Sequence, residues 1–296
     1  MKKALFIVNP KSGLGRIKNE LLNILSLFTQ NGYFASVFTT TCQGSATEFI
    51  CNNTLADYDI CVVCGGDGTL NEVITGFMMA GFDIPLGYVP AGTLNEWSSG
   101  LKISRNIKKA AEDILASKIV TLDLGKFNDD YFCYTASFGA FTEASYSAPQ
   151  NVKNVLGQAA YLLEGIKKIG DIKPIHMQVK TATHVIEDDF LFGAVSNSMS
   201  LGGVLKFDSN VINLNDGMFE IVLIHKPSNI LELQSIIDGL LKKDFTRRGL
   251  TFLHSDSVAF EGGENIPWTL DGEYNPGGNN IEIKNLHSAL RLLLKA

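Results

Sequence analysis

The stretch YDICVVCGGDGTLNE, residues 58–72, decides the fold of this chain. Its first half contains a continuous apolar run from Ile60 to Cys64, which has the length of a buried β-strand. Three glycines follow within four positions, and an apolar pattern with helical spacing then begins at Leu70. A strand that passes through a glycine turn directly into a helix is the repeating unit of a parallel α/β sheet.

The same alternation of strand and helix continues on both sides of this stretch. The patterns predict strands at residues 4–8, 34–40, 60–63 and 86–89, and helices at residues 17–28, 45–50, 70–79 and 106–116. We therefore expect an α/β N-terminal domain over residues 1–124, with a parallel sheet covered by helices on both faces.

The pattern changes after about residue 120, where several apolar segments alternate with polar positions. Strands are predicted at residues 122–124, 131–137, 175–180, 190–196, 218–225, 257–261, 266–270 and 281–283, and helices near residues 151–169 and 230–241. Such alternation is typical of antiparallel sheets with one buried face. We expect a mainly antiparallel β-sandwich over residues 125–286, and a C-terminal strand, about residues 287–296, that returns to the first domain.

Trp268 and an aromatic stripe admit two interpretations, a packed core or the wall of a lipid cleft. Core packing is the more common role of such residues. The stripe consists of Tyr131, Phe132, Tyr134, Phe138 and Phe141.

The 296-residue chain has 45% apolar and 19% charged residues, which is typical of a globular protein with a large core. Its net charge of −6 and its lack of any long Lys/Arg run disfavour nucleic-acid binding and electrostatic attraction to anionic membranes. The apolar run at residues 4–8 is too short for a signal peptide, and no stretch is long enough for a transmembrane helix. We therefore expect a cytoplasmic protein that binds no nucleic acid.

Five scattered cysteines fit a reducing compartment. Cys61 and Cys64 have the spacing of a redox or zinc pair, but residues three apart on a strand point to opposite faces. We expect both to be small core residues.

The glycine segment at residues 65–72 has the chemistry of a phosphate site. Glycines let the main chain approach a ligand closely, and the N–H groups at a helix start attract anions. Asp67 would repel phosphate unless a divalent cation lay between them. The alternative interpretation is an Asp-Gly turn that serves only the strand–helix connection.

Two further segments follow predicted strands. PAGTLNE, residues 90–96, again combines glycine with polar side chains, although Thr93 and Glu96 also fit a capping box. NPKSGLGR, residues 9–16, resembles a phosphate loop in composition but lacks the ending of a Walker A loop. The Rossmann and protein-kinase motifs are also missing, which disfavours those nucleotide folds.

Taken in order, three segments resemble the diacylglycerol/sphingosine lipid kinase family. They are Asn-Pro-x-Ser-Gly at residues 9–13, Gly-Gly-Asp-Gly-Thr at residues 65–69 and Pro-x-Gly-Thr-x-Asn at residues 90–95. The resemblance continues through LDLG at residues 122–125, NDG at 215–217 and LDGE at 270–273, so it spans nearly the whole chain. It implies a bacterial two-domain enzyme with an NAD-kinase-like first domain, which uses ATP and Mg²⁺ as cofactors.

The resemblance also implies the site residues, with ATP bound in a cleft between the two domains. The nucleotide-binding residues would be Asn9, Pro10, Lys11, Ser12, Gly13, Thr40, Gly65, Gly66, Asp67, Gly68, Thr69, Leu70, Asn71, Glu72, Thr93 and Asn95. The magnesium site would consist of Asn213, Asp216 and Met218, and the catalytic residues would be Asp67, Glu96, Asp271 and Glu273.

Two features of the implied site stay undecided by the sequence. Asp271 and Glu273 are both candidates for the general base. The family usually has Asp where this chain has Glu96, so this carboxylate reaches one methylene further.

The implied activity is the transfer of the ATP γ-phosphate to a hydroxyl of diacylglycerol or a related lipid. The sequence leaves the acceptor lipid open, together with a transient peripheral contact at the inner membrane face and a homodimer. An NAD kinase-like enzyme and a catalytically silent nucleotide-binding regulator are the alternatives. The segments at residues 90–95, 216–217 and 271–273 favour the lipid kinase.

Overall fold

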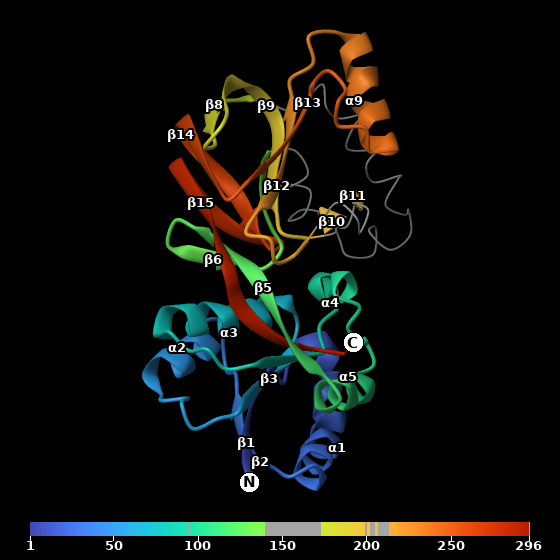
Figure 1. Ribbon diagram of the computed structural model, residues 1–296, viewed down its shortest axis with the longest axis vertical. Helices are drawn as coiled ribbons and strands as arrows, with labels where there is room; N and C mark the ends of the chain where they lie inside the picture. Colours follow the sequence, from blue (N-terminus) through green and yellow to red (C-terminus); the bar gives the residue numbers. More distant parts are fainter. Residues whose placement is uncertain (94, 140–172, 199, 202–204, 207–212, 296) are drawn as a thin grey trace. The chain divides into compact units, whose positions relative to one another are not determined.

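The computed structural model describes residues 1–93, 95–139, 173–198, 200–201, 205–206 and 213–295. These residues form two compact units, the first comprising residues 1–123 and 288–296 and the second residues 124–287 (Figure 1). Each unit has its own apolar core. Among the described residues, no helix is both long enough and apolar enough to cross a bilayer.

The sheet of the first unit is parallel. Its strands are β1 (Lys2–Val8), β2 (Tyr33–Thr39), β3 (Ile60–Gly65) and β4 (Leu86–Pro90), hydrogen-bonded in the order β4-β3-β1-β2. Leu292, near the C-terminus, pairs with Leu86 and continues the sheet beside β4. Because all strands point the same way, the loops after β1, β3 and β4 emerge at one edge.

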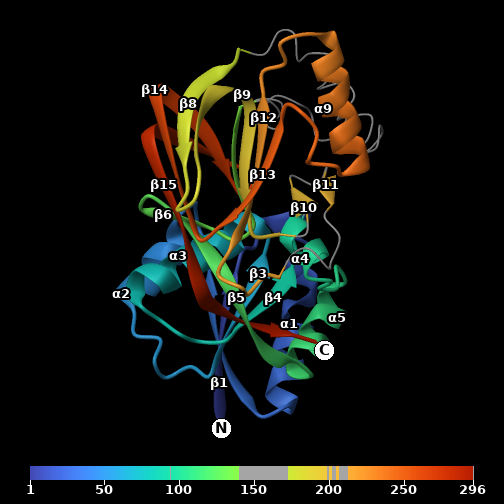
Figure 2. The same cartoon turned by 45° about the horizontal axis from the view of Figure 1, so that its top comes forward.

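Helices cover both faces of this sheet. They are η1 (Ser12–Gly15), α1 (Arg16–Gln30), α2 (Ser45–Asn52), α3 (Asp67–Ala80), α4 (Glu96–Gly100) and α5 (Ile107–Leu115). Figure 2 shows α1 and α5 on one side of the strands and α2 and α3 on the other. Side chains of α1 and α5 share one apolar cluster with alternate residues of β1 and β3, which is the pattern that the sequence periodicity predicts.

Cys61 and Cys64 are fully buried on β3, as the strand pattern predicts. Cys64 lies in the cluster beneath α1 and α5, and burial raises the pKa of its thiol to about 12. Burial also raises the pKa of Cys61 far above its usual value. Both thiols are therefore neutral core groups, and no cluster of metal-binding side chains occurs in the described parts of the chain.

The second unit is mainly antiparallel, as the alternating pattern predicts. Its strands follow one continuous order, β13-β12-β9-β7-β14-β15, rather than the two separate sheets of a sandwich, and β8 pairs with both β9 and β14. The strands are β5 (Lys118–Phe127), β6 (Asp130–Phe132), β7 (Thr135–Gly139), β8 (Ile175–Lys180), β9 (Val185–Ser196), β10 (Ser200–Leu201), β11 (Leu205–Lys206), β12 (Phe219–His225), β13 (Leu250–Ser255), β14 (Ser257–Leu270) and β15 (Glu273–Leu294).

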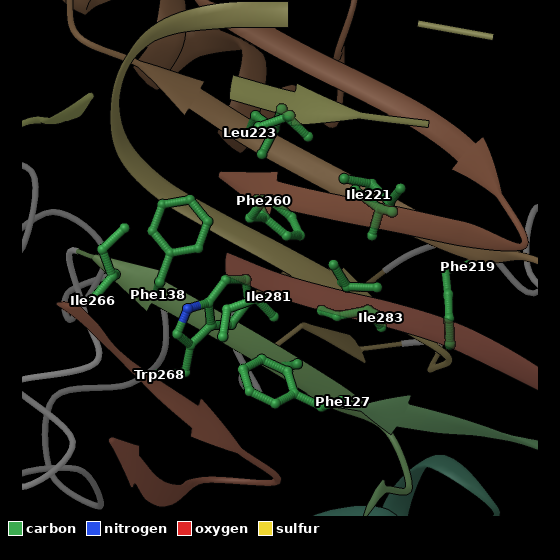
Figure 3. Close-up of a cluster of buried hydrophobic side chains, with 14 of the residues drawn as sticks. Phe127, Phe138, Phe219, Ile221, Leu223, Phe260, Ile266, Trp268, Ile281 and Ile283 are labelled. Carbon is green, nitrogen blue, oxygen red and sulfur yellow. The ribbon is translucent and has the colours of Figure 1, made fainter. Parts of the chain in front are cut away.

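One apolar cluster fills the interior that these strands enclose (Figure 3). Trp268 lies at its centre, with ring centroids 4.8 Å from Phe138 and 5.0 Å from Phe260. Core packing is therefore the role of Phe132, Phe138 and Trp268, whereas Phe141 lies outside the described residues. A second cluster lies between the sheet and the helix α9 (Ile230–Lys242).

The structure corrects several predicted boundaries in this unit. The two strands predicted within residues 257–270 are one strand with register shifts, whereas the strand predicted at residues 131–137 is two. β13 was not predicted. The first part of β15 was also not predicted, because the run PGGNN at residues 276–280 resembles a turn, whereas residues 281–283 and the segment from about residue 287 were predicted as strand. The helix predicted at residues 151–169 lies outside the described residues.

Candidate functional site

Three loops meet at the carboxyl edge of the first unit's sheet, after β1, β3 and β4. The Asn9 side chain donates to Thr69 Oγ1 at 2.9 Å, which joins the first loop to the second. The Ala91 N–H donates to the Gly65 carbonyl at 2.7 Å, which joins the second loop to the third. Asn9, Thr69 and Gly65 are predicted site residues, so the structure brings these parts of the predicted site together.

Glycines allow the main chains of these loops to touch. Gly13 has a φ of +52°, and a Cβ atom there would overlap the Ala91 carbonyl oxygen. A Cβ on Gly92 would lie 2.6 Å from the Gly66 Cα, and one on Gly66 would lie 3.5 Å from Ser12 Oγ. The result is a surface built mostly of main chain, which we call the glycine cradle (residues 9–13, 65–69, 91–93 and 95). Such concave main-chain surfaces at helix starts are suited to anions.

The position of Asp67 in the cradle suggests a carboxylate that is available to a ligand, but both of its oxygens contact protein groups. One carboxylate oxygen accepts the Glu96 N–H at 2.8 Å, and the other accepts the Tyr88 hydroxyl at 3.4 Å. Burial raises the pKa of Asp67, and these hydrogen bonds oppose that increase. Asp67 therefore links the second loop to the start of α4 through its own side chain.

Asn95 holds the third loop in shape. It adopts a left-handed conformation, with a φ of +49°, that asparagine tolerates better than most residues. Its side chain accepts the Gly92 N–H at 3.0 Å and donates to the Gly92 carbonyl at 2.9 Å. α4 begins at Glu96 without a side-chain cap, so the alternative interpretation of Thr93 and Glu96 as a capping box is wrong.

Glu72 and Thr40 lie around the same edge of the sheet. The Glu72 carboxylate accepts the N–H groups of Gly44, at 2.9 Å, and Ala46, at 3.2 Å, and so caps the start of α2. Thr40 is buried, and its N–H donates to the Val8 carbonyl at 2.9 Å, immediately before Asn9. The structure thus places Thr40 beside the first cradle loop.

The remaining predicted residues of this edge differ in exposure. Lys11, Gly68 and Thr93 are exposed, whereas Leu70 is buried. Asn71 accepts a hydrogen bond from Thr75 along α3 at 3.4 Å. Pro10 is half-buried.

Sequence reasoning missed Tyr88 and Arg16. The Tyr88 hydroxyl lies within hydrogen-bond distance of both Asp67 Oδ1, at 3.4 Å, and Asn95 Oδ1, at 3.3 Å, but in the sequence Tyr88 is one residue of an apolar strand. The Arg16 Nη2 donates to the Gly92 carbonyl at 3.2 Å. The only sequence signal for Arg16 was its position three residues after Gly13.

The second unit contains the Asp271 turn (residues 270–273), between β14 and β15. Asp271 is buried, with a φ of +51°, and its two carboxylate oxygens accept three main-chain N–H groups. The donors are Cys133 at 2.7 Å, Tyr134 at 2.9 Å and Thr135 at 3.1 Å. Glu273 is exposed. The structure therefore separates two acidic residues that were equivalent in the sequence.

The predicted magnesium residues share a short turn before β12. Asp216 accepts the Met218 N–H at 3.0 Å, and Asn213 accepts the Asn215 N–H at 3.2 Å. The Met218 carbonyl accepts the Asn285 side-chain amide at 3.2 Å. Oxygen atoms from a carboxylate, an amide and a carbonyl thus lie within six residues, and oxygen is the ligand that Mg²⁺ prefers.

Comparison with known proteins identifies the family. The model of the diacylglycerol kinase catalytic domain matches residues 3–127. A diacylglycerol kinase of Bacillus subtilis is 31% identical over 99% of this chain and 97% of its own length. One of Staphylococcus saprophyticus is 28% identical over 96% of this chain and 93% of its own length.

The fold gives the same result. The crystal structure of a diacylglycerol kinase from Bacillus anthracis superposes with a TM-score of 0.79 and 25% identity, over 99% of this chain and 97% of that one. An α/β unit with a glycine cradle, followed by a mainly antiparallel unit, is therefore the architecture of a known group of phosphotransferases. The chain belongs to the diacylglycerol kinase family and is a lipid kinase, with an alcohol group as the phosphate acceptor.

Proposed function

We propose that this lipid kinase transfers the γ-phosphate of ATP to a hydroxyl of diacylglycerol or of a related lipid. The observation that carries the proposal is the glycine cradle, in which main chain from three loops lies in contact at one edge of the sheet. The lipid follows from the relatives, since the Bacillus subtilis protein is named a diacylglycerol kinase.

The first unit is, in this proposal, an NAD-kinase-like nucleotide-binding domain. The phosphates would lie against the loops at residues 9–13, 65–69, 93 and 95, while Thr40 and residues 70–72 complete the surroundings. Phosphoryl transfer passes through a loose transition state, so catalysis depends mainly on positioning and on neutralising charge. Asp67, Glu72 and Asn95 would act by fixing loop positions, since their side chains already bind protein groups.

The second unit would supply the general base and bind the acceptor. Among the two candidates, we propose that Glu273 accepts the proton of the lipid hydroxyl. Its exposed carboxylate can approach a substrate, whereas Asp271 already accepts three N–H groups. Asp271 would then hold the turn that presents Glu273.

Magnesium would be held by Asn213, Asp216 and the Met218 carbonyl. The donor set fits a hard cation, because all three groups offer oxygen and Mg²⁺ keeps several water ligands when protein ligands are few. When bound, the ion supplies positive charge that orders this turn and balances nearby carboxylates. In the protein itself, the bonds from Met218 and Asn285 already fix two of these oxygens.

A lipid acceptor also requires a route to the bilayer. We propose a cytoplasmic protein that reaches its substrate by transient contact with the inner membrane face. A homodimer is a separate proposal, which sedimentation of the full chain would test.

The deciding experiment incubates the full chain with γ-labelled ATP and Mg²⁺, in parallel with a total lipid extract and with NAD. Label in a lipid, identified by mass spectrometry, is the expected result. Label in NAD alone would favour the NAD kinase alternative. ATP binding without transfer to either acceptor would instead favour a silent nucleotide-binding regulator.

A further inference from the structure

Arg16 is a cation that is hydrogen-bonded to the glycine cradle. Its guanidinium donates from Nη2 to the Gly92 carbonyl at 3.2 Å, so it connects the start of α1 with the third loop. A guanidinium carries five N–H donors in a rigid fork. A single bond to Gly92 fixes its position and leaves most of that fork for another acceptor.

The position of Arg16 conflicts with local helix electrostatics. Arg16 is the first residue of α1, and the preceding Gly15 makes no side-chain cap. No acidic residue occupies the first turn of α1. The first turns of α2 and α3, in contrast, contain Glu48 and Asp67, respectively. A cation at the positive end of a helix dipole is unfavourable, typically by about 0.3–1 kcal/mol on exposed surfaces.

Such local conflicts are expected at functional sites, where a ligand removes them. An anion bound at the cradle would interact favourably with the uncapped start of α1 and with the guanidinium. The acidic residues Asp67, in the cradle, and Glu72, beside it, do not fill this role, because both accept main-chain N–H groups elsewhere. The observations therefore favour a polyphosphate as the missing partner of Arg16.

We propose that Arg16 binds the phosphate chain of the nucleotide and sets the affinity of this enzyme for ATP. This inference rests on the proposed function, since it assumes that the cradle holds ATP. Arginine suits the role because its planar fork matches two phosphate oxygens at once, which the point charge of lysine cannot do. The bond to Gly92 holds the fork in place before the ligand arrives.

A purely structural role makes a different prediction. If Arg16 only clamps the third loop, its loss would disturb the whole nucleotide site and lower the melting temperature. Affinity for adenosine and for ATP would then fall together. A phosphate-binding role affects ATP alone.

The test compares full-length wild-type protein with the variants Arg16→Gln, Arg16→Lys and Lys18→Gln. Dissociation constants for ATP and ADP are measured by calorimetry, and adenosine is measured by competition. We expect Arg16→Gln to raise the dissociation constants of ATP and ADP by tenfold or more, on the scale of one lost charge-assisted contact. The dissociation constant of adenosine should not change. Arg16→Lys should recover part of the loss.

Lys18→Gln is the matched control, because it removes the same charge from the same turn of α1. Residues two apart on a helix do not share a face, so we expect less than a threefold effect. Equal losses of ATP affinity in Arg16→Gln and Lys18→Gln would show that the effect comes from the net charge of this region rather than from a contact with Arg16. That result would overturn the proposal. Equal losses of ATP and adenosine would assign Arg16 to the clamp and overturn it as well.

The failure of the inference is distinguishable from the failure of the proposed function. If the wild-type protein binds ATP and Arg16→Gln binds it equally well, only the role of Arg16 is wrong. If the wild-type protein binds neither ATP nor ADP, the nucleotide site itself is wrong, and the role of Arg16 is overturned with it.

Discussion

The glycine cradle of the first unit and the Asp271 turn of the second unit both contain acidic residues, but they leave different groups for a ligand. At the edge of the sheet that carries the cradle, Asp67 and Glu72 accept main-chain N–H groups of other segments, and what is left for a ligand is the glycine main chain and the start of α3. In the turn, Asp271 accepts three N–H groups, and the group left over is the exposed carboxylate of Glu273.

Because of this difference, the cradle is suited to binding an anion and the Asp271 turn is suited to proton transfer. Main-chain amides attract an anion without titrating, so the cradle is suited to polyphosphate. An exposed carboxylate can accept a proton, so the turn is suited to general-base catalysis. In both regions a hydrogen-bonded carboxylate fixes the segment that, in the proposed function, faces a ligand.

The largest expected effect is on Glu273. We expect Glu273→Gln to lower turnover by about 10²–10⁴-fold, the usual share of a general base. Because the side chain is exposed, the free energy of unfolding should change by less than about 0.5 kcal/mol. Steady-state lipid phosphorylation and urea unfolding measure the two quantities. Wild-type turnover in this variant would remove Glu273 from the mechanism.

Asp271→Asn tests the other half of the comparison. The substitution places an amide donor against three N–H donors and removes charge-assisted bonds, so we expect a loss of about 3–4 kcal/mol in stability. The urea midpoint measures this loss. If instead stability is unchanged while turnover falls as far as expected for Glu273→Gln, the roles of the two residues are reversed.

Sequence patterns predicted the elements of the first unit well, because its strands and helices have distinct apolar periods. They also located the three cradle loops, since glycines follow the strands predicted at residues 4–8, 60–63 and 86–89. The hydrogen-bond partners of polar side chains could not be predicted. The sequence alone gives no reason to assign different roles to Asp271 and Glu273. They differ because Asp271 accepts three N–H groups from residues 133–135, which are far away in the chain.

The order of strands in the second unit could likewise not be predicted from the sequence. It depends on pairings between distant segments, such as Thr135 with Ser196 and Ser196 with Glu220. β15 continues through glycine and asparagine residues because β14 pairs with it, so tertiary contacts override local turn preference. Tyr88 shows the same limit, since its hydroxyl acquires a role only when Asp67 and Asn95 lie beside it.

Gly13→Ala tests whether the cradle depends on contact between main chains. Gly13 and Gly32 both have positive φ, at +52° and +83°, but only Gly13 would place a Cβ against another loop. We expect a loss of about 2–3 kcal/mol for Gly13→Ala and about 1 kcal/mol for the control Gly32→Ala. ATP affinity should fall only in the first variant. Equal losses of stability and unchanged ATP affinity would contradict the cradle.

Glu220 adds a third kind of carboxylate to the comparison, because it is buried with one oxygen that accepts no hydrogen bond within the described residues. Its residue is 2% exposed, and Oε2 has no hydrogen-bond partner within the described residues. The His254 ring faces Oε1 at 3.5 Å. Burial, with a smaller contribution from Asp216, raises the pKa of Glu220 from 4.5 to about 8.

A raised pKa fixes the sign of the pH dependence. Below pH 4.5 the carboxyl is protonated in both the folded and the unfolded state, and it does not affect the pH profile. Between pH 4.5 and about 8 the unfolded chain releases a proton that the folded protein keeps, so stability falls as pH rises. Above pH 8 this loss is complete.

Glu220→Gln removes this titration while keeping the shape of the side chain, and it has the smallest expected effect. In EDTA, which keeps the 213–218 turn free of metal, we expect equal stability of variant and wild type at pH 5. At pH 8.5 the variant should be more stable by about 1–2 kcal/mol, a value reduced from the full shift because buried sites relax. Urea unfolding at both pH values measures the difference. Parallel pH profiles would mean that Glu220 ionises as easily in the folded protein as in the unfolded chain. The set of three main-chain donors would then not be what distinguishes Asp271 from other buried acids.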